Sequence, residues 1–365
     1  MTQINTYLAQ LGNRKDQVTG SISLPIHLST TYAHPGLGAS TGYDYTRTKN
    51  PTRTVLEEGL AVLEGGTHAI ATSSGMSAIQ LVFQLFDSGS EFLVSRDLYG
   101  GSYRYFQELE RQEVAIFHYY QNWEELEEKL TNQITALFVE TPTNPLMEEV
   151  DLAELAKKAK AVESVLIVDN TLLTPLRQKP LDLGAQIVVH SGTKFLTGHN
   201  DVLAGVVVTN VPALGERLNW LANTTGPTLS PLDCWLFIRS LKTLPLRIDR
   251  QEKTAKKIVD ALKNHPKIKD VLYAGKGAMI SIRLVDGDLV GPTLEALKLF
   301  TYAESLGGVE SLITYPTTQT HADIPQELRE SYGLTPDLLR LSIGLEEADD
   351  LIDDLIQALG GSNNG

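Results

Sequence analysis

The sequence of 365 residues has little cysteine, no long apolar run and no excess of positive charge. Its single cysteine, Cys234, excludes an intramolecular disulfide and a cysteine-rich metal site. Cys234 stands in an apolar stretch without a neighbouring histidine, so we interpret it as a packing residue rather than a nucleophile. No apolar run approaches the roughly 18 residues of a membrane span, and the N-terminus lacks the apolar core of a signal peptide. We therefore expect a cytoplasmic protein.

The charge balance argues against a nucleic-acid partner. The formal net charge is −14, whereas phosphate binding needs clustered lysine and arginine. The eight histidines are scattered, and His190 and His199 lack the spacing of metal ligands, so no metal site is expected. Apolar residues make up 42% and charged residues 21%, as in ordinary globular proteins.

Short, apolar, β-branched runs recur between segments of helical periodicity, such as 75–87 and 151–162. The expected strands are 67–72, 91–95, 114–118, 134–140, 165–169, 186–190 and 203–209. Several are almost wholly apolar, which suits strands covered on both faces. Alternating strands and helices predict an α/β fold with a mostly parallel, seven-stranded sheet.

The two ends of the chain differ in pattern from the alternating strands and helices between them. A long helix over 231–265, kinked at Pro245, leads to strands at 269–275 and 277–285, a helix at 292–306, strands near 309–314 and 339–344, and a last helix. We divide the chain into an irregular N-terminal arm (1–50), a large domain (51–235) and a smaller C-terminal α+β domain (236–365). The arm is rich in glycine and proline, and an irregular segment of this length is usually disordered or functional.

Three groups of residues stand at ends of expected strands, where open α/β sheets place their ligands. SSGMSA (73–78) opens a helix whose backbone N–H groups could hold an anion, although such turns are common. Asp169 ends an apolar strand, either as a helix cap or Asx turn, or as an anion facing a protonated ring nitrogen or a metal. Lys194, in HSGTKF (190–195), is expected to lose charge by desolvation, which would let its amine form an imine.

One cofactor would use all three groups. Pyridoxal 5'-phosphate (PLP) combines an aldehyde, a ring nitrogen and a phosphate. Tyr99, after the expected strand 91–95, could stack on the ring or simply pack in a turn.

At this point the chain resembles the Cys/Met-metabolism PLP enzymes, the family of cystathionine γ-synthase, cystathionine γ-lyase, cystathionine β-lyase, methionine γ-lyase and O-acetylhomoserine sulfhydrylase. The resemblance covers about residues 5–358 and implies PLP-dependent transferase fold type I. It is carried by GYDYTRTKNPTR (42–53), SSGMSA, DLYGG (97–101), ETPTNP (140–145), VDNT (168–171), HSGTKFLTGHND (190–201), ESLGGVESLITYP (304–316) and LRLSIGLE (339–346).

The resemblance implies a role for each matching residue. Lys194 would be the Schiff-base lysine and proton shuttle, Asp169 the partner of the pyridinium, and Tyr99 the stacked ring that assists catalysis. The remaining implied contacts are Gly75, Met76, Ser191 and Thr193 at the phosphate, Tyr45 and Arg47 reaching that phosphate from a neighbouring subunit, and Arg340, Asn144 and Ser311 at the substrate α-carboxylate. The arm would thus complete a neighbour's site within a homotetramer.

The chain departs from the family pattern at Gly192, at Leu172, where an aromatic residue is usual, and in a short segment around 273–284. Glu310 and Asp44 are candidates for attracting the distal ammonium of cystathionine or cysteine, or are ordinary solvated carboxylates. We therefore favour γ-elimination or γ-replacement on L-cystathionine, or on an O-acylhomoserine with L-cysteine. The alternatives are cystathionine β-lyase and O-acetylhomoserine sulfhydrylase, and a catalytically silent PLP-fold binding protein is a remote one.

Overall fold

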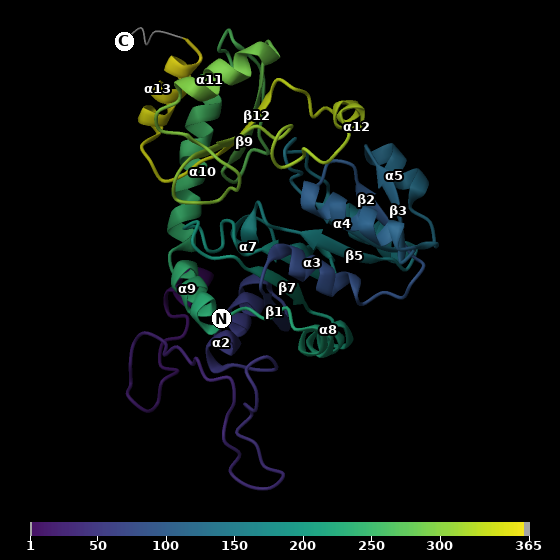
Figure 1. Ribbon diagram of the computed structural model, residues 1–365, viewed down its shortest axis with the longest axis vertical. Helices are drawn as coiled ribbons and strands as arrows, with labels where there is room; N and C mark the ends of the chain where they lie inside the picture. Colours follow the sequence, from purple (N-terminus) through teal and green to yellow (C-terminus); the bar gives the residue numbers. More distant parts are fainter. Residues whose placement is uncertain (1, 361–365) are drawn as a thin grey trace.

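Seven strands form the larger of two sheets in the computed structural model, which describes residues 2–360 (Figure 1). The strands are β1 (His68–Thr72), β2 (Ser90–Ser95), β3 (Ala115–Tyr120), β4 (Ile134–Glu140), β5 (Val165–Asp169), β6 (Ile187–Ser191) and β7 (Gly205–Thr209). Their spatial order is β1-β7-β6-β5-β4-β2-β3, and β7 alone runs antiparallel to its neighbours. The predicted α/β fold with a mostly parallel seven-stranded sheet is confirmed.

Helices cover both faces of this sheet. They are α2 (Pro51–Glu64), α3 (Gly75–Phe83), α4 (Gly100–Arg111), α5 (Trp123–Lys129), α6 (Leu152–Ala161), α7 (Thr174–Arg177), the 3₁₀ turn η1 (Pro180–Leu183) and α8 (Pro212–Thr225). In β6, Val189 packs in the same buried cluster as α3, whereas Val188 packs in the cluster that contains α2. Because successive side chains of a strand point to opposite faces, burial on both sides explains the nearly continuous apolar runs.

The start of α2 shows how the sequence sets a helix boundary. Asn50 caps the helix, and its side chain accepts hydrogen bonds from the backbone N–H groups of Thr52 and Arg53. Pro51 follows at the first helical position, where no N–H is needed. The helix ends at Gly65, whose φ of 79° is a left-handed conformation that favours glycine.

The long helix expected over 231–265 is instead two helices, α9 (Pro231–Leu241) and α10 (Leu244–Leu262). Pro245 lies in the first turn of α10, where its missing N–H costs no helical hydrogen bond. The proline therefore begins a new helix rather than kinking a continuous one. In Figure 1, α10 runs from the large sheet to the smaller one.

The smaller sheet has the order β10-β11-β12-β9-β8 and is antiparallel except between β10 and β11. Its elements are β8 (Ile268–Leu272), β9 (Met279–Leu284), η2 (Gly287–Leu289), α11 (Val290–Ala296), β10 (Thr301–Tyr302), β11 (Leu312–Thr314), α12 (Gln326–Ser331), β12 (Leu338–Ser342) and α13 (Ala348–Ala358). The helix expected over 292–306 ends at Ala296. Asp354 of α13 then accepts the N–H groups of Lys298, Leu299 and Phe300, which holds the following chain out of a helix.

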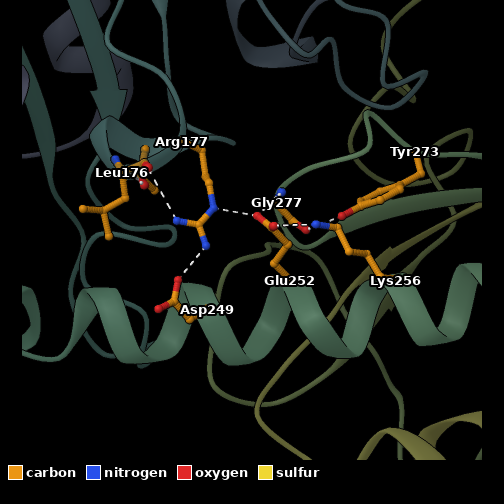
Figure 2. A network of polar contacts seen from close by, with 8 residues as sticks. Leu176, Arg177, Asp249, Glu252, Lys256, Tyr273 and Gly277 are labelled. Carbon is orange, nitrogen blue, oxygen red and sulfur yellow. Dashed lines mark hydrogen bonds and ion pairs between the residues drawn. The ribbon is translucent and has the colours of Figure 1, made fainter.

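A polar network joins the large sheet to α10 and the β8–β9 turn (Figure 2). Arg177, at the end of α7, donates to Asp249 (2.7 Å) and to Glu252 (2.6 Å) of α10. Glu252 also accepts the backbone N–H of Gly277 (2.9 Å) and a bond from Lys256 (2.7 Å). Burial of Glu252 opposes ionisation, but the bonds from Lys256 and Arg177 prevail and lower its pKa to about 2. The short β8–β9 turn is thus tied to the segment that follows β5.

The N-terminal segment contains one short helix, α1 (Ile4–Ala9), and then extends away from the sheet in irregular loops (Figure 1). Val18, Ile22, Leu28 and Leu37 are exposed along it. Among residues 2–360, no helix is both long and apolar enough to cross a membrane.

Candidate active site

The carboxyl ends of three neighbouring parallel strands meet at one cavity. Glu140 ends β4 and pairs in register with Asp169, which ends β5 and pairs with Val189 of β6. Strand order and register therefore bring together Glu140, Asp169 and Val189, which are separated by up to 49 positions in the sequence. The cavity is lined by Ser74, Gly75, Met76, Ile79, Tyr99, Glu140, Asn144, Asp169, Thr171, Leu172, Val189, His190, Ser191, Thr193, Lys194, Leu203, Glu304, Ser305, Leu306, Thr320 and Arg340.

Lys194 follows β6 in a tight turn and lies in this cavity. Its Nζ donates a hydrogen bond of 2.9 Å to Ser305 Oγ, on the small-sheet side. Burial, with a smaller contribution from the charge of Arg340, lowers the pKa of Lys194 to about 8, and Glu304 acts in the opposite direction. A substantial fraction of the amine is therefore neutral near pH 8, as imine formation requires.

Asp169 is held in an Asx turn, one of the local roles considered for it from the sequence. Its Oδ1 accepts hydrogen bonds from Thr171 N (2.9 Å) and Thr171 Oγ1 (2.5 Å). Thr171 Oγ1 in turn accepts the backbone N–H of Ser191 (2.8 Å), which links the ends of β5 and β6. Burial raises the pKa of Asp169, while the Thr171 bonds and the nearby His190 oppose that rise. A cationic ring nitrogen would compensate the remaining desolvation cost.

The N-terminus of α3 lies close to the end of β6. A Cβ atom on Gly75 would come within 2.9 Å of Ser191 Cβ, so the close approach requires glycine. The free N–H groups of the first helical turn and the hydroxyls of Ser191 and Thr193 border the same space. This arrangement fits a phosphate group.

Tyr99 lies at the start of α4, and its position depends on Gly101 and Glu140. A Cβ atom on Gly101 would lie 2.4 Å from the Tyr99 ring, so the glycine leaves room for the ring. The backbone N–H of Tyr99 donates to Glu140 Oε2 at 2.9 Å. Burial and the neighbouring Asp169 carboxylate raise the pKa of Glu140 well above its usual range. Sequence reasoning missed Glu140, although it ends an apolar strand just as Asp169 does.

Arg340 brings a positive charge from the small sheet to the cavity. It is almost fully buried in β12, and its guanidinium donates to Asn144 Oδ1 (2.9 Å), Ser305 O (2.9 Å) and Thr314 Oγ1 (3.1 Å). Arg340 Nε has no protein partner among residues 2–360. Burial lowers the pKa of Arg340 to about 10, so it remains cationic at neutral pH. A planar cation with an unused donor fits a carboxylate ligand.

Two predicted residues lie outside the cavity. Ser311 is fully buried, and its backbone N–H and hydroxyl donate to Glu346 at 2.7 and 2.8 Å. Glu310 is exposed and accepts a bond from Asn200 (2.8 Å). The cavity of this chain is lined by Ser305 and Glu304 and not by Ser311 or Glu310, whose substrate-binding roles stay predictions. The tripeptide Glu-Ser-Leu occurs twice, at 304–306 and at 310–312, so the sequence alone does not show which copy lines the cavity. The path of the loop decides between the two copies.

The predicted residues of the N-terminal segment also lie away from this chain's own cavity. Tyr45 is half exposed, Asp44 accepts a bond from Ser40 (2.5 Å), and Arg47 donates to the side chain of Asn223 (3.1 Å). None of them lines the cavity of the same chain.

Comparison with known proteins shows which family the chain is related to. The sequence profile of the family described as Cys/Met metabolism PLP-dependent enzyme matches residues 5–360. The chain is 52% identical to a cystathionine gamma-synthase/O-acetylhomoserine (thiol)-lyase of Bacillus subtilis, over 98% of this chain and 96% of that one. It is 50% identical to a cystathionine gamma-synthase of Haemophilus influenzae, over 98% and 99%. A crystal structure of cystathionine gamma synthase from Xanthomonas oryzae pv. oryzae, in complex with aminoacrylate and cysteine, superposes with a TM-score of 0.96, at 38% identity, over 99% and 98% of the two chains.

Proposed function

The chain belongs to the Cys/Met metabolism PLP-dependent enzyme family, and we propose that it catalyses γ-replacement or γ-elimination in transsulfuration. Its substrates would be L-cystathionine, or an O-acylhomoserine with L-cysteine. The observation that carries this proposal is the cavity itself, in which Lys194, Asp169 and Arg340 converge from two sheets. The two relatives at 52% and 50% identity carry cystathionine γ-synthase in their names, which favours γ- over β-chemistry.

The cavity fits PLP at each of its polar groups. Lys194 would hold the aldehyde carbon, Asp169 the ring nitrogen, and Tyr99 the face of the ring. Gly75, Met76, Ser191 and Thr193 would hold the phosphate, where the close approach of α3 to β6 leaves room only for glycine. Bound PLP supplies an electron-accepting ring that delocalises the charge left when a substrate proton is removed.

The residues of the chain then provide binding and proton transfer. Arg340, with Asn144 beside it, binds the substrate α-carboxylate and fixes the orientation of Cα. As a free amine, Lys194 would remove the Cα proton and, for γ-chemistry, would also move a proton at Cβ. The lowered pKa of Lys194, about 8, allows it to act as both base and acid near neutral pH.

Glu304 is the carboxylate placed to select the distal part of the substrate. It lines the cavity beside Ser305, and it also borders a second hollow with Asn200, Asp201 and Leu203. A distal ammonium of cystathionine, or the amine of incoming cysteine, would be attracted there. We therefore propose for Glu304 the role that the sequence suggested for Glu310, six residues later.

The N-terminal arm (1–50) would complete the site of a neighbouring subunit in a homotetramer. Tyr45 and Arg47 lie outside the cavity of their own chain, while the arm exposes apolar side chains that a second copy would bury. Asp44 would reach the neighbour's substrate by the same route. Mixing Lys194→Ala with Arg47→Ala subunits should restore part of the activity, because some hybrid sites regain both residues. Hybrids without activity would contradict the shared site.

Product analysis with L-cystathionine tests the reaction. γ-Elimination releases cysteine and 2-oxobutanoate, whereas homocysteine and pyruvate would overturn the proposal in favour of a β-lyase. Incubation with O-acetyl- or O-succinylhomoserine and cysteine tests the synthase direction by the appearance of cystathionine. The Lys194→Ala protein is the matched control for each assay. A wild-type protein that stays colourless with PLP would refute the PLP enzyme altogether.

A further inference from the structure

A buried carboxylate lies on the face of the large sheet that is opposite the cavity. Glu64, the last residue of α2, is 1% exposed, and its Oε1 lies 2.6 Å from His190 Nε2 and accepts a bond of 3.1 Å from Asn170 Nδ2. His190 and Asn170 are equally buried. Glu64 does not line the cavity and has no place in the proposed chemistry.

The partners of Glu64 are the sequence neighbours of cavity residues. His190 precedes Ser191 at the end of β6, and Asn170 follows Asp169 at the end of β5. Adjacent side chains at a strand end point to opposite faces, so Ser191 and Asp169 face the cavity while the His190 ring and the Asn170 amide reach Glu64 on α2. His190 also borders the cavity. Each hydrogen bond to Glu64 therefore restrains the backbone of one strand end from the face of the sheet opposite the cavity.

Gln178 extends the same network to the third strand end. Gln178 Nε2 donates to Asn170 Oδ1 (3.2 Å) and to the backbone oxygen of Thr141 (3.0 Å), the residue after Glu140. Asn170 Nδ2 returns a bond to Gln178 O (2.8 Å). The ends of β4, β5 and β6 are thus joined behind the cavity by side-chain hydrogen bonds.

Burying these polar side chains carries a desolvation cost that an apolar contact between α2 and the sheet would avoid. Glu64 Oε2 and His190 Nδ1 have no hydrogen-bond partner among residues 2–360. A buried carboxylate with one oxygen unpaired is expensive, and an apolar side chain would satisfy the packing of α2 with less desolvation. Buried polar networks instead define one arrangement of the elements that they connect.

We propose that Glu64 is a positioning residue that holds the ends of β5 and β6 in register from behind, so that Asp169 and Lys194 meet one cofactor. This inference rests on the proposed function, since the cofactor site is the feature that needs the spacing. Its first consequence does not depend on the cofactor: without Glu64, the two strand ends open more often in the protein free of PLP.

The test compares Glu64→Ala with Glu64→Gln and with Glu57→Ala. Gln keeps a side-chain oxygen that can accept both hydrogen bonds. Glu57 is a matched control, because it lies on the same helix and accepts a backbone N–H, that of Ala71 (3.0 Å), away from the cavity. Backbone hydrogen exchange of the PLP-free proteins and PLP dissociation constants are measured for all three variants and the wild type.

Glu64→Ala should speed exchange at 169–171 and 190–191, and weaken PLP binding, by about tenfold each, because buried donors lose their acceptor. Glu64→Gln should restore most of both values, and Glu57→Ala should leave PLP binding within about twofold of the wild type. Faster exchange throughout the chain with unchanged PLP affinity would show a merely structural role and overturn the proposal.

Gln178→Ala keeps the test decisive if Glu64→Ala does not fold. It removes only the link between Asn170 and Thr141 and should speed exchange at 169–171 by about threefold. Unchanged exchange there would overturn the proposal. If the wild-type protein fails to bind PLP, the proposed function falls, while the exchange comparison still decides the role of Glu64.

Discussion

The two sides of the cavity are built differently. On the large-sheet side, Asp169, Ser191 and Lys194 stand at or just after the ends of adjacent parallel strands, and backbone hydrogen bonds set their spacing. On the small-sheet side, Glu304 and Ser305 lie in a loop between β10 and β11, and Arg340 alone comes from a strand. Strand pairing thus sets the large-sheet side, here called the floor of the cavity, whereas the other side depends on the path of one loop.

This difference assigns the two sides to different tasks. The floor carries the groups that would hold a cofactor permanently, and the loop side carries the groups that would meet each new substrate. The bond from Lys194 Nζ to Ser305 Oγ is a direct contact between the two sides. Changes on the floor should therefore affect cofactor binding and chemistry together, and changes in the loop should affect substrate selection.

Lys194→Ala should have the largest effect. Lys194 is the base assigned to the Cα proton, and we expect turnover to fall by about a thousandfold or more without its amine. The visible absorption band of the PLP-loaded protein should also be lost. Lys276→Ala, in the β8–β9 turn, is a suitable control. Substantial turnover in Lys194→Ala would refute the assignment of the base.

Arg340→Lys tests the strand residue of the opposite side. Lysine keeps the charge but loses the planar fork that also holds Asn144 and Ser305. We expect kcat/KM to fall by about a hundredfold, mainly through KM, because charge-assisted bonds to the carboxylate are lost. Titration with PLP should show nearly unchanged cofactor affinity. An equal loss of PLP affinity would remove the distinction between the two sides.

The pH dependence of PLP uptake reports the state of Lys194. Its lowered pKa, about 8, means that the reactive neutral amine is lost as the pH falls below that value. The association rate with the PLP-free protein should therefore drop by about tenfold for each pH unit below 8 and level off above it. Stopped-flow absorbance measures this directly. A rate that kept rising to pH 10 would show that burial does not lower this pKa.

Glu304→Gln and Glu310→Gln distinguish the two carboxylates of the loop. Glu304 lines the cavity and Glu310 does not, so only the first change should raise the KM for L-cystathionine, by about threefold to fivefold for a partly solvated charge. Steady-state kinetics of the two variants side by side provide the comparison. An effect confined to Glu310→Gln would restore the original prediction.

Glu140→Gln should have the smallest effect, although Glu140 lies beside Asp169 on the floor. Burial and the Asp169 charge raise the pKa of Glu140 and so favour its protonated carboxyl, which an amide of the same shape replaces closely. We expect PLP affinity to stay within about twofold of the wild type. A loss of tenfold would mean that Glu140 is ionised in the working enzyme.

Much of the floor could be predicted from the sequence because its residues follow local rules. Each of the seven apolar runs became a strand, and Asp169 and Lys194 were identified from their places beside strand ends. Glu140 obeys the same rule, and attention to all strand-end carboxylates would have found it. Thr171 and Glu64 carried no such signal, because their contacts join segments up to 126 residues apart.

The residues that line the small-sheet side of the cavity could not be predicted from the sequence, for a physical reason. The segment 304–312 contains two serines and two glutamates in the same short pattern, and periodicity cannot decide which pair faces a ligand. Glu346, 35 residues away, accepts two hydrogen bonds from Ser311 and holds it away from the cavity, which Ser305 lines instead. The break between α9 and α10 was likewise hidden, since a proline fits both a kink and a first helical turn.

The sequence by itself determined the alternation of strands and helices, the class of the fold and the lysine at its centre, because apolar periodicity and strand-end chemistry are local properties. Only the tertiary structure decided which glutamate and serine of the loop meet the cavity and which buried carboxylate supports it from behind. Those choices depend on hydrogen bonds between distant segments, and a buried polar group is assigned to a partner only when the whole chain has packed.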